Sequence, residues 1–133
     1  RNCAESGIKD VGIIGVDSGW ELYVGGNGGI KTEAGEFFVK VKTADEVAEY
    51  SFAFLQLYRE EAFYLERTVH YMQRVGLEYI KKVVLEDEAR RKALAQRLMF
   101  SLSFEGDGWK KAIAEQSLKK EYETIQLTQI EPA

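Results

Sequence analysis

The sequence changes its hydrophobic period at Thr43, and this change constrains the fold more than any other feature. Before it, short stretches alternate apolar and polar residues, which is the pattern of β-strands. After it, apolar residues recur every three or four positions up to about residue 102, which is the pattern of helices. Thr43 and Glu46 have the spacing of a capping box at a helix start. The sequence therefore predicts an α+β fold, with a small, mostly antiparallel sheet in residues 11–42 and a helical region in residues 43–120.

Three strands are expected in the first part. Residues 11–16 form an apolar run rich in β-branched side chains, and the turn residues Asp17-Ser18-Gly19 separate this run from the alternating residues 20–24. These two strands should form a hairpin. A third strand is expected over residues 37–42, where simple alternation puts three apolar side chains on one face: Phe37, Val39 and Val41.

The helical part is expected to begin at the Thr43 cap and to contain several helices. The first has an apolar face that comprises Val47, Tyr50, Phe54 and Tyr58. The spacing of Leu65 extends this face. Gly76 suits the C-terminus of a helix, because glycine adopts the left-handed conformation often found there. A last, weaker helix is predicted over residues 109–120, and an extended tail is predicted over residues 121–133, which contain the single proline of the sequence.

Composition excludes several classes of protein. The chain of 133 residues is 45% hydrophobic and 30% charged, which fits one globular domain or a large piece of one. Its net charge of −4 argues against a non-specific nucleic-acid binder, and no apolar run approaches the ~20 residues that cross a bilayer. A single cysteine excludes an internal disulfide framework. We therefore expect a cytoplasmic protein with neither a nucleic acid nor a membrane as its partner.

The glycine-rich stretch "YVGGNGGIKTE" is a candidate binding loop. Several glycine amides in succession can turn toward one point and form a nest for a carboxylate or phosphate, with Lys31 and Thr32 in support. The same residues also suit a wide turn between two strands. The sequence leaves both interpretations open for this loop, which contains Gly25, Gly26, Asn27, Gly28 and Gly29.

Other polar residues give weaker indications of chemistry. One cysteine, Cys3, and one histidine, His70, cannot by themselves build a zinc site, which draws several such ligands at short spacing. His70 is interpreted as an ordinary helix residue. The carboxylates of Glu60, Glu61 and Glu66 lie among arginines, and a solvated, salt-bridged helix face explains them better than acid–base catalysis does.

Three stretches, taken in order, resemble one enzyme family. They read "RNCAESGIKDVGIIGVDSGWELYVGGNGGIKTE", "FFVKVKTADEV" and "FLQLYREEAFYLERTVHYMQRVGLEYIKK". Over about residues 1–100 the chain resembles the C-terminal part of the large subunit of NAD(P)H-dependent assimilatory nitrite reductase, in the nitrite and sulfite reductase family. The resemblance implies an oxidoreductase module that binds sirohaem and a [4Fe-4S] cluster and reduces nitrite to ammonia with six electrons.

The resemblance also implies site residues. The family holds its cluster through a C-x5-C pair and a C-x3-C pair, and the second pair typically reads C-P-R-N-C. Cys3 matches the last cysteine of that pair, which is a metal ligand whose sulfur bridges the cluster to the sirohaem iron. Arg1 and Asn2 match the loop between the paired cysteines, and the loop at Gly25–Gly29 becomes a candidate cofactor edge.

The three other cluster ligands do not occur in this sequence, so the chain is expected to be a fragment that begins inside the cofactor motif. Residues 1–120 would be the C-terminal fragment of the sirohaem and [4Fe-4S] domain. The family resemblance places FAD and NAD(P)H on other domains, and the isolated fragment is expected to be inactive and to bind no cofactor. The implied partners are the upstream domains of the same polypeptide and the nitrite reductase small subunit. The fragment itself is expected to self-associate through residues 1–42, where a sheet edge is exposed.

Three alternatives remain open at this stage. The chain could be a sulfite reductase fragment, a non-catalytic packing or interaction module, or an anion-binding module that uses the glycine nest. The stretch "LQLYREEAFYLERTVHY" favours nitrite reductase over sulfite reductase.

Overall fold

The computed structural model describes residues 3–104, 106–108 and 110. The chain divides into two compact units, Arg1–Ser101 and Leu102–Ala133. Every strand and nearly every helix described below lies in the first unit. The helix predicted over residues 109–120 and the tail over residues 121–133 fall outside the described residues, apart from Lys110.

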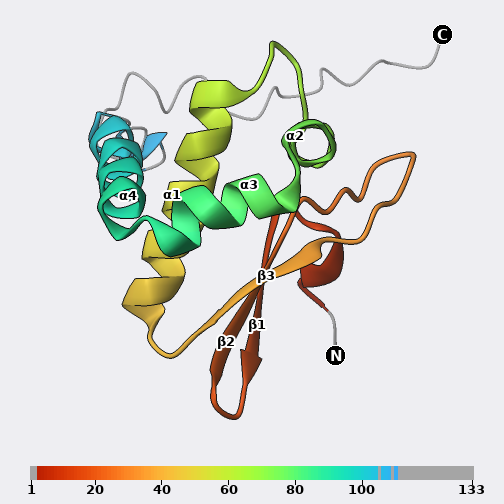
Figure 1. Cartoon of the computed structure of the whole chain (residues 1–133), viewed down its shortest axis with the longest axis horizontal. Helices are drawn as coiled ribbons and strands as arrows, with labels where there is room; N and C mark the ends of the chain where they lie inside the picture. Colours follow the sequence, from red (N-terminus) through yellow and green to blue (C-terminus); the bar gives the residue numbers. More distant parts are fainter. Residues whose placement is uncertain (1–2, 105, 109, 111–133) are drawn as a thin grey trace, which may run out of the picture. The chain divides into compact units, whose positions relative to one another are not determined.

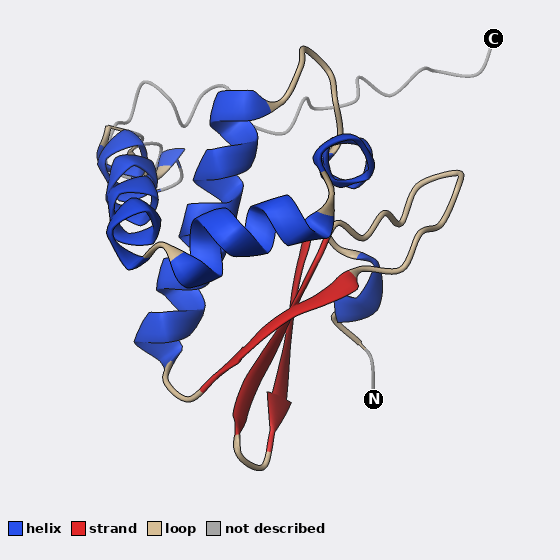
Figure 2. Cartoon of the chain, in the orientation of Figure 1, coloured by secondary structure: helices blue, strands red, loops and turns tan. Residues whose placement is uncertain are grey.

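The first unit contains a three-stranded antiparallel sheet followed by helices, which confirms the predicted α+β class (Figure 2). The strands β1 (Val11–Val16), β2 (Gly19–Val24) and β3 (Glu36–Val41) lie in sheet order β1-β2-β3. β1 and β2 form the predicted hairpin, in which Ile13 faces Leu22. A short 3₁₀ turn, η1 (Ser6–Ile8), precedes the sheet.

The third strand differs from the prediction in which side chains it buries. Phe38 is only 2% exposed, whereas Phe37 is 47% exposed and stacks edge-on against Tyr23. The cause is a β-bulge: Leu22 faces Val39 and the next residue, Tyr23, faces Phe37, so Phe38 is an extra residue without a partner. The expected alternation of Phe37, Val39 and Val41 is therefore wrong at its first position.

Within residues 3–104, five helical segments follow the sheet, and the first begins as predicted. They are α1 (Ala44–Glu61), α2 (Thr68–Val75), α3 (Leu77–Lys81), the π-helical segment η2 (Lys82–Glu86) and α4 (Glu88–Ser103). The Thr43 hydroxyl accepts a hydrogen bond from the Glu46 amide at 3.2 Å, and the Glu46 carboxylate accepts one from the Thr43 amide at 3.0 Å. This confirms the capping box. Gly76, with φ 84°, ends α2 as expected, and its amide donates a hydrogen bond to the Met72 carbonyl at 2.8 Å.

The predicted apolar face of the first helix extends less far than expected. α1 ends at Glu61 because Ala62 adopts an extended backbone. Leu65 lies beyond this end, is 82% exposed, and has the left-handed φ of 60°. It therefore does not continue the buried face, and the prediction for Leu65 is wrong.

One core joins the sheet to the helices. The bulge residue Phe38 packs against Phe54 of α1, with their ring centroids 6.1 Å apart. α4 adds Leu94 and Ala95 to the same core. The hairpin turn between β1 and β2 extends away from the helices (Figure 2). Fourteen buried side chains form this cluster: Leu22, Val24, Phe38, Val41, Ala53, Phe54, Leu57, Tyr71, Met72, Ile80, Val83, Val84, Leu94 and Ala95.

Candidate functional site

The segment that carries Cys3 leads into a short turn that precedes the first strand of the sheet in the sequence. Cys3 is a free, exposed cysteine, whereas Arg1 and Asn2 lie outside the described residues. Glu5 takes a left-handed backbone conformation, with φ 52°, and starts η1. The Ile8 amide donates to the Glu5 carbonyl at 3.0 Å and closes this turn.

Backbone hydrogen bonds fix this turn to the glycine-rich loop. The Gly35 amide donates to the Gly7 carbonyl at 2.8 Å, and the Gly26 amide donates to the Lys9 carbonyl at 3.0 Å. The Gly25 amide donates to the Asp10 carbonyl at 3.0 Å. In Figure 1 the η1 segment accordingly lies beside the connection between β2 and β3. The residues that follow Cys3 in the chain, from Gly7 to Asp10, and the glycine-rich loop are therefore neighbours in the structure. We call residues 7–10 the Cys3 seat.

Close approach explains two of the loop glycines, Gly26 against the backbone of residues 8 and 9 and Gly25 against the Met72 side chain. A Cβ atom on Gly26 would lie 2.7 Å from the Ile8 carbonyl carbon and the Lys9 carbonyl oxygen. Gly25 has φ 74°, and a Cβ there would lie 2.2 Å from the Met72 sulfur. Gly28 is less restricted, because its nearest atom is the flexible Ile8 Cδ1 at 3.2 Å, and Gly29 has no contact shorter than 3.4 Å. The glycine requirement is therefore strongest where the Cys3 segment touches the loop.

The amides of the loop are partly engaged within the protein. Those of Gly25 and Gly26 donate to the Cys3 seat, and the Asn27 amide pairs with the Glu33 carbonyl at 2.9 Å. The Asn27 side chain donates to the Lys31 carbonyl at 2.7 Å, and the Lys31 ammonium pairs with the Glu33 carboxylate at 2.8 Å. Within the described chain, the amides of Gly28 and Gly29 have no backbone hydrogen-bond acceptor. An anion at this loop would therefore meet the amides at its tip.

Asp10 completes this region, and sequence reasoning missed it. Its carboxylate accepts hydrogen bonds from Arg67 Nη2 at 3.3 Å and from the Thr68 hydroxyl, at the start of α2. These partners are 57 and 58 residues away in sequence. No local spacing pattern gives a signal for such a contact.

The glutamates near the end of α1 form ion pairs, which confirms the salt-bridged interpretation, although the partners differ from the nearest arginines in sequence. Glu60 pairs with Arg97 at 2.7 Å, and Glu66 pairs with Arg74 at 2.8 Å. The Arg74 guanidinium lowers the pKa of Glu66 to about 2, and the Phe63 amide adds to this effect. Glu66 is therefore a fixed negative charge at neutral pH.

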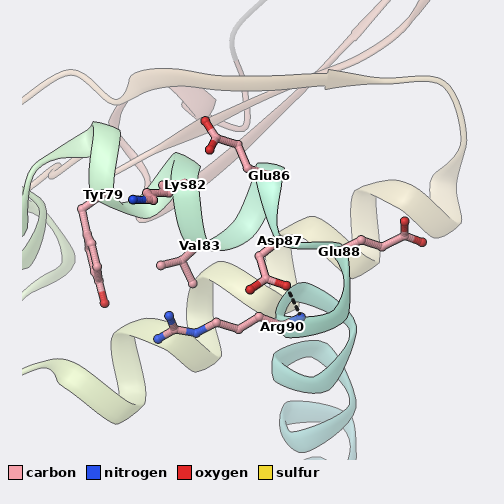
Figure 3. Close-up of a pocket in the computed structure, with 7 residues that line it drawn as sticks. All are labelled: Tyr79, Lys82, Val83, Glu86, Asp87, Glu88 and Arg90. Carbon is pink, nitrogen blue, oxygen red and sulfur yellow. Dashed lines mark hydrogen bonds between the residues drawn. The ribbon is translucent and has the colours of Figure 1, made fainter.

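Glu61 organises a second polar cluster at a surface pocket. Its carboxylate accepts hydrogen bonds from the hydroxyls of Tyr71 and Tyr79, both at 2.7 Å, and lies 3.6 Å from Arg90. Burial, and then the bond to Glu61, raises the pKa of the Tyr71 hydroxyl. In Figure 3, the Arg90 side chain extends toward the hydroxyl end of Tyr79, with Val83 drawn above it. The pocket has a volume of about 560 Å³ and is lined by Tyr79, Lys82, Val83, Glu86, Asp87, Glu88 and Arg90.

The described residues fit an iron–sulfur cluster in kind but not in number. A cluster needs thiolate ligands, normally four, and Cys3 is the single cysteine of the sequence. Among the described residues, no group of three or more His, Cys, Asp or Glu side chains could hold a metal ion. His70 is exposed on α2, as expected for an ordinary helix residue. This chain by itself can therefore supply one thiolate ligand.

None of the described helices is long and apolar enough to cross a membrane.

Comparisons with known proteins give a consistent result. A family model described as the nitrite and sulphite reductase 4Fe-4S domain matches residues 1–92. The chain is 52% identical over 121 residues to "Nitrite reductase [NAD(P)H]" of Bacillus subtilis, covering 91% of this chain and 15% of that protein. It is 34% identical to "Nitrite reductase (NADH) large subunit" of Escherichia coli, covering 66% of this chain and 11% of that protein. It is 32% identical to "Sulfite reductase, assimilatory-type" of Nitratidesulfovibrio vulgaris, covering 62% of this chain and 38% of that protein.

The chain thus spans a small part of the length of the nitrite reductases that it matches. No solved structure matches it significantly. The family match covers most of the first compact unit, including Cys3, the glycine-rich loop and α1 to η2. The chain belongs to the nitrite and sulphite reductase 4Fe-4S domain family.

Proposed function

We propose that this chain is the C-terminal part of the sirohaem and [4Fe-4S] module of an NAD(P)H-dependent nitrite reductase large subunit. The reaction is the six-electron reduction of nitrite to ammonia. The observation that carries this proposal is the 52% identity over nine-tenths of the chain to a protein of that name. Because the chain spans 15% of that protein, the activity belongs to a longer polypeptide. The proposed module includes residues 1–120.

Cys3 is the proposed cluster ligand of this chain, and its thiolate would hold the [4Fe-4S] cluster of the sirohaem module. Bound together, the two groups supply the electron path to nitrite. The protein's own contribution is the Cys3 seat, which backbone hydrogen bonds from Gly25, Gly26 and Gly35 fix in place a few residues after the thiol. Arg1 and Asn2 are proposed to flank the cluster beside Cys3.

The loop Gly25–Gly29 is proposed to border the cofactor. Its position against the Cys3 seat supports this proposal. The amides of Gly28 and Gly29 are the ones available to a cofactor carboxylate, whereas Gly25, Gly26 and Asn27 contribute through packing and backbone bonds to the seat. This assignment combines the two interpretations of the loop, because its base is a structural turn and its tip is the binding edge.

The longer polypeptide is proposed to contain the domains for FAD and NAD(P)H and to associate with a nitrite reductase small subunit. We propose the cytoplasm as its compartment, because the single cysteine allows no internal disulfide and the family resemblance points the same way. The alternative substrate is sulfite, because the family model includes both enzymes and one relative is named a sulfite reductase. The higher identity to the B. subtilis nitrite reductase favours nitrite.

The test uses a reductase host, defined as the B. subtilis nitrite reductase with this chain in place of its matching segment. Iron and sulfide are added anaerobically to the host and to the 133-residue chain, and bound iron is measured after desalting. We expect a full cluster on the host and none on the chain, which supplies one thiolate. The host should reduce nitrite faster than sulfite. A stoichiometric cluster on the isolated chain, or a host that turns over only sulfite, would contradict the proposal.

A further inference from the structure

Asp10 lies where three parts of the molecule meet. Its backbone carbonyl accepts the Gly25 amide at 3.0 Å, which ties it to the glycine-rich loop. Its carboxylate accepts hydrogen bonds from Arg67 Nη2 and from the Thr68 hydroxyl, which ties it to α2. Asp10 is also the last residue of the Cys3 seat. A displacement of Asp10 would therefore be transmitted to the segment that carries Cys3.

The contact with α2 is electrostatically favourable. Arg67 is the N-cap residue of α2, but its side chain makes no capping hydrogen bond. The first turn of a helix has unsatisfied amides and a partial positive charge, so a nearby carboxylate stabilises it. Asp10 provides that carboxylate from a distant part of the chain. Thr68, which donates to it, is only 3% exposed, so the donor side of this hydrogen bond is buried, whereas the Asp10 side chain is 45% exposed.

The glycine-rich loop is fixed to the same helix. Gly25, whose amide bonds to Asp10, lies against the Met72 side chain of α2, where a Cβ atom would overlap the sulfur. The next amide, of Gly26, bonds to Lys9. α2, the loop and residues 7–10 therefore form one connected unit. Within this unit, Asp10 is the residue whose side chain bonds to α2.

We propose that Asp10 is a positioning residue for the Cys3 thiolate, acting by anchoring the Cys3 seat to the N-terminus of α2. This inference rests on the proposed function, because it assumes that Cys3 is a cluster ligand. It assigns to a residue outside the cysteine motif the role of fixing how the ligand meets the cluster. Arg67 and Thr68 act as its donors.

The test compares variants of the reconstituted reductase host. Asp10→Ala removes both side-chain contacts, Asp10→Asn keeps one acceptor oxygen for Thr68, and Thr68→Val removes one donor. Glu5→Gln is the control on the same segment, because the exposed Glu5 carboxylate pairs with Lys9 in solvent, where such an ion pair contributes little. Two quantities are measured: the rate at which a chelator removes iron, and the electron paramagnetic resonance spectrum of the reduced cluster.

We expect Asp10→Ala to lose iron about tenfold faster than the unmodified host, as the loss of a hydrogen bond to a charged group implies. Its spectrum should shift. Thr68→Val should change in the same direction by a smaller factor, and Asp10→Asn and Glu5→Gln should stay near the unmodified host. Leu94→Ala, a core variant in α4 away from the seat, controls for general destabilisation.

The proposal is overturned if Asp10→Ala releases iron at the unmodified rate with an unchanged spectrum. It is also overturned if Asp10→Ala releases iron no faster than Leu94→Ala, because a merely structural role would then suffice. Failure of the proposed function has a different signature: the host with Cys3→Ser would retain its cluster. In that case Cys3 is not a ligand, and a positioning role for Asp10 fails with it.

Discussion

Replacement of Gly26 by alanine tests whether the glycine-rich loop packs closely against the Cys3 seat. The added Cβ would lie 2.7 Å from two backbone atoms of Ile8 and Lys9 and 2.8 Å from a third. Backbone atoms cannot rotate away as a side chain can, so residues 8 and 9 must move. Overpacking costs ~1–3 kcal/mol, and loss of the 3.0 Å bond from Gly26 to Lys9 costs ~0.5–1.5 kcal/mol. We therefore expect the free energy of unfolding to fall by about 1.5–4.5 kcal/mol.

The same loop provides graded controls for this substitution. Gly28→Ala meets only the end of the Ile8 side chain, at 3.2 Å, and should cost less than ~1 kcal/mol. Gly29→Ala has no contact below 3.4 Å and should fall within ~0.5 kcal/mol of the unmodified chain. Urea unfolding followed by circular dichroism measures all three. If Gly26→Ala is as stable as Gly29→Ala, the close approach of the Cys3 segment is refuted.

Three further predictions concern the 133-residue chain. Leu65→Gly should raise the free energy of unfolding by ~0.5–1 kcal/mol in urea, because the exposed Leu65 has a left-handed φ of 60° that glycine adopts without strain; a loss of stability would contradict this. The folded pKa of Glu66, about 2, lies below its unfolded value of 4.5, so its pairing with Arg74 stabilises the fold above pH 4.5 and is lost as the pH falls toward 2. The urea midpoint of Glu66→Gln should accordingly change less between pH 5.5 and pH 3 than that of the unmodified chain, and an equal change would argue against the pairing. Self-association through residues 1–42 should appear in sedimentation as a concentration-dependent increase in mass that Ile14→Lys abolishes, since β1 is an uncharged edge strand; a monomer at every concentration would count against it.

Local sequence signals predicted the parts of the fold that local interactions determine. The Thr43–Glu46 capping box, the Gly76 helix end and the hairpin around Asp17-Ser18-Gly19 each depend on residues within a few positions of one another. The change of period at Thr43 likewise separated the sheet from the helices. These features require no knowledge of distant contacts.

Features that depend on distant contacts were missed or misplaced. The bulge at Phe38 arises from pairing with β2 and from packing against Phe54, so simple alternation could not reveal it. Leu65 continued the helical period in the sequence, but the chain leaves α1 after Glu61. The Asp10 contact with Arg67 and Thr68 joins residues almost sixty positions apart. Each of these requires the tertiary fold, which the spacing of residues in one sequence does not encode.

The candidate site was predictable to an intermediate degree. The resemblance selected Cys3, and the run of glycines selected the loop; the structure joins the residues after Cys3 to the loop region through the bonds from Gly25, Gly26 and Gly35. The division of the loop into a packed base and an accessible tip could not be predicted, because consecutive glycines look alike in sequence. Only the neighbours of each missing Cβ distinguish them.

The central claim is that Cys3 delivers a thiolate to an iron–sulfur cluster. The measurement that tests it most directly is the iron and acid-labile sulfide content of the reductase host with Cys3→Ser, purified beside the unmodified host and a Ser6→Ala control from the same turn. The account predicts a full cluster in the host and in the control, and loss of most iron and sulfide in Cys3→Ser, because serine replaces one of the normally four thiolate ligands. Equal iron and sulfide in all three proteins would contradict it.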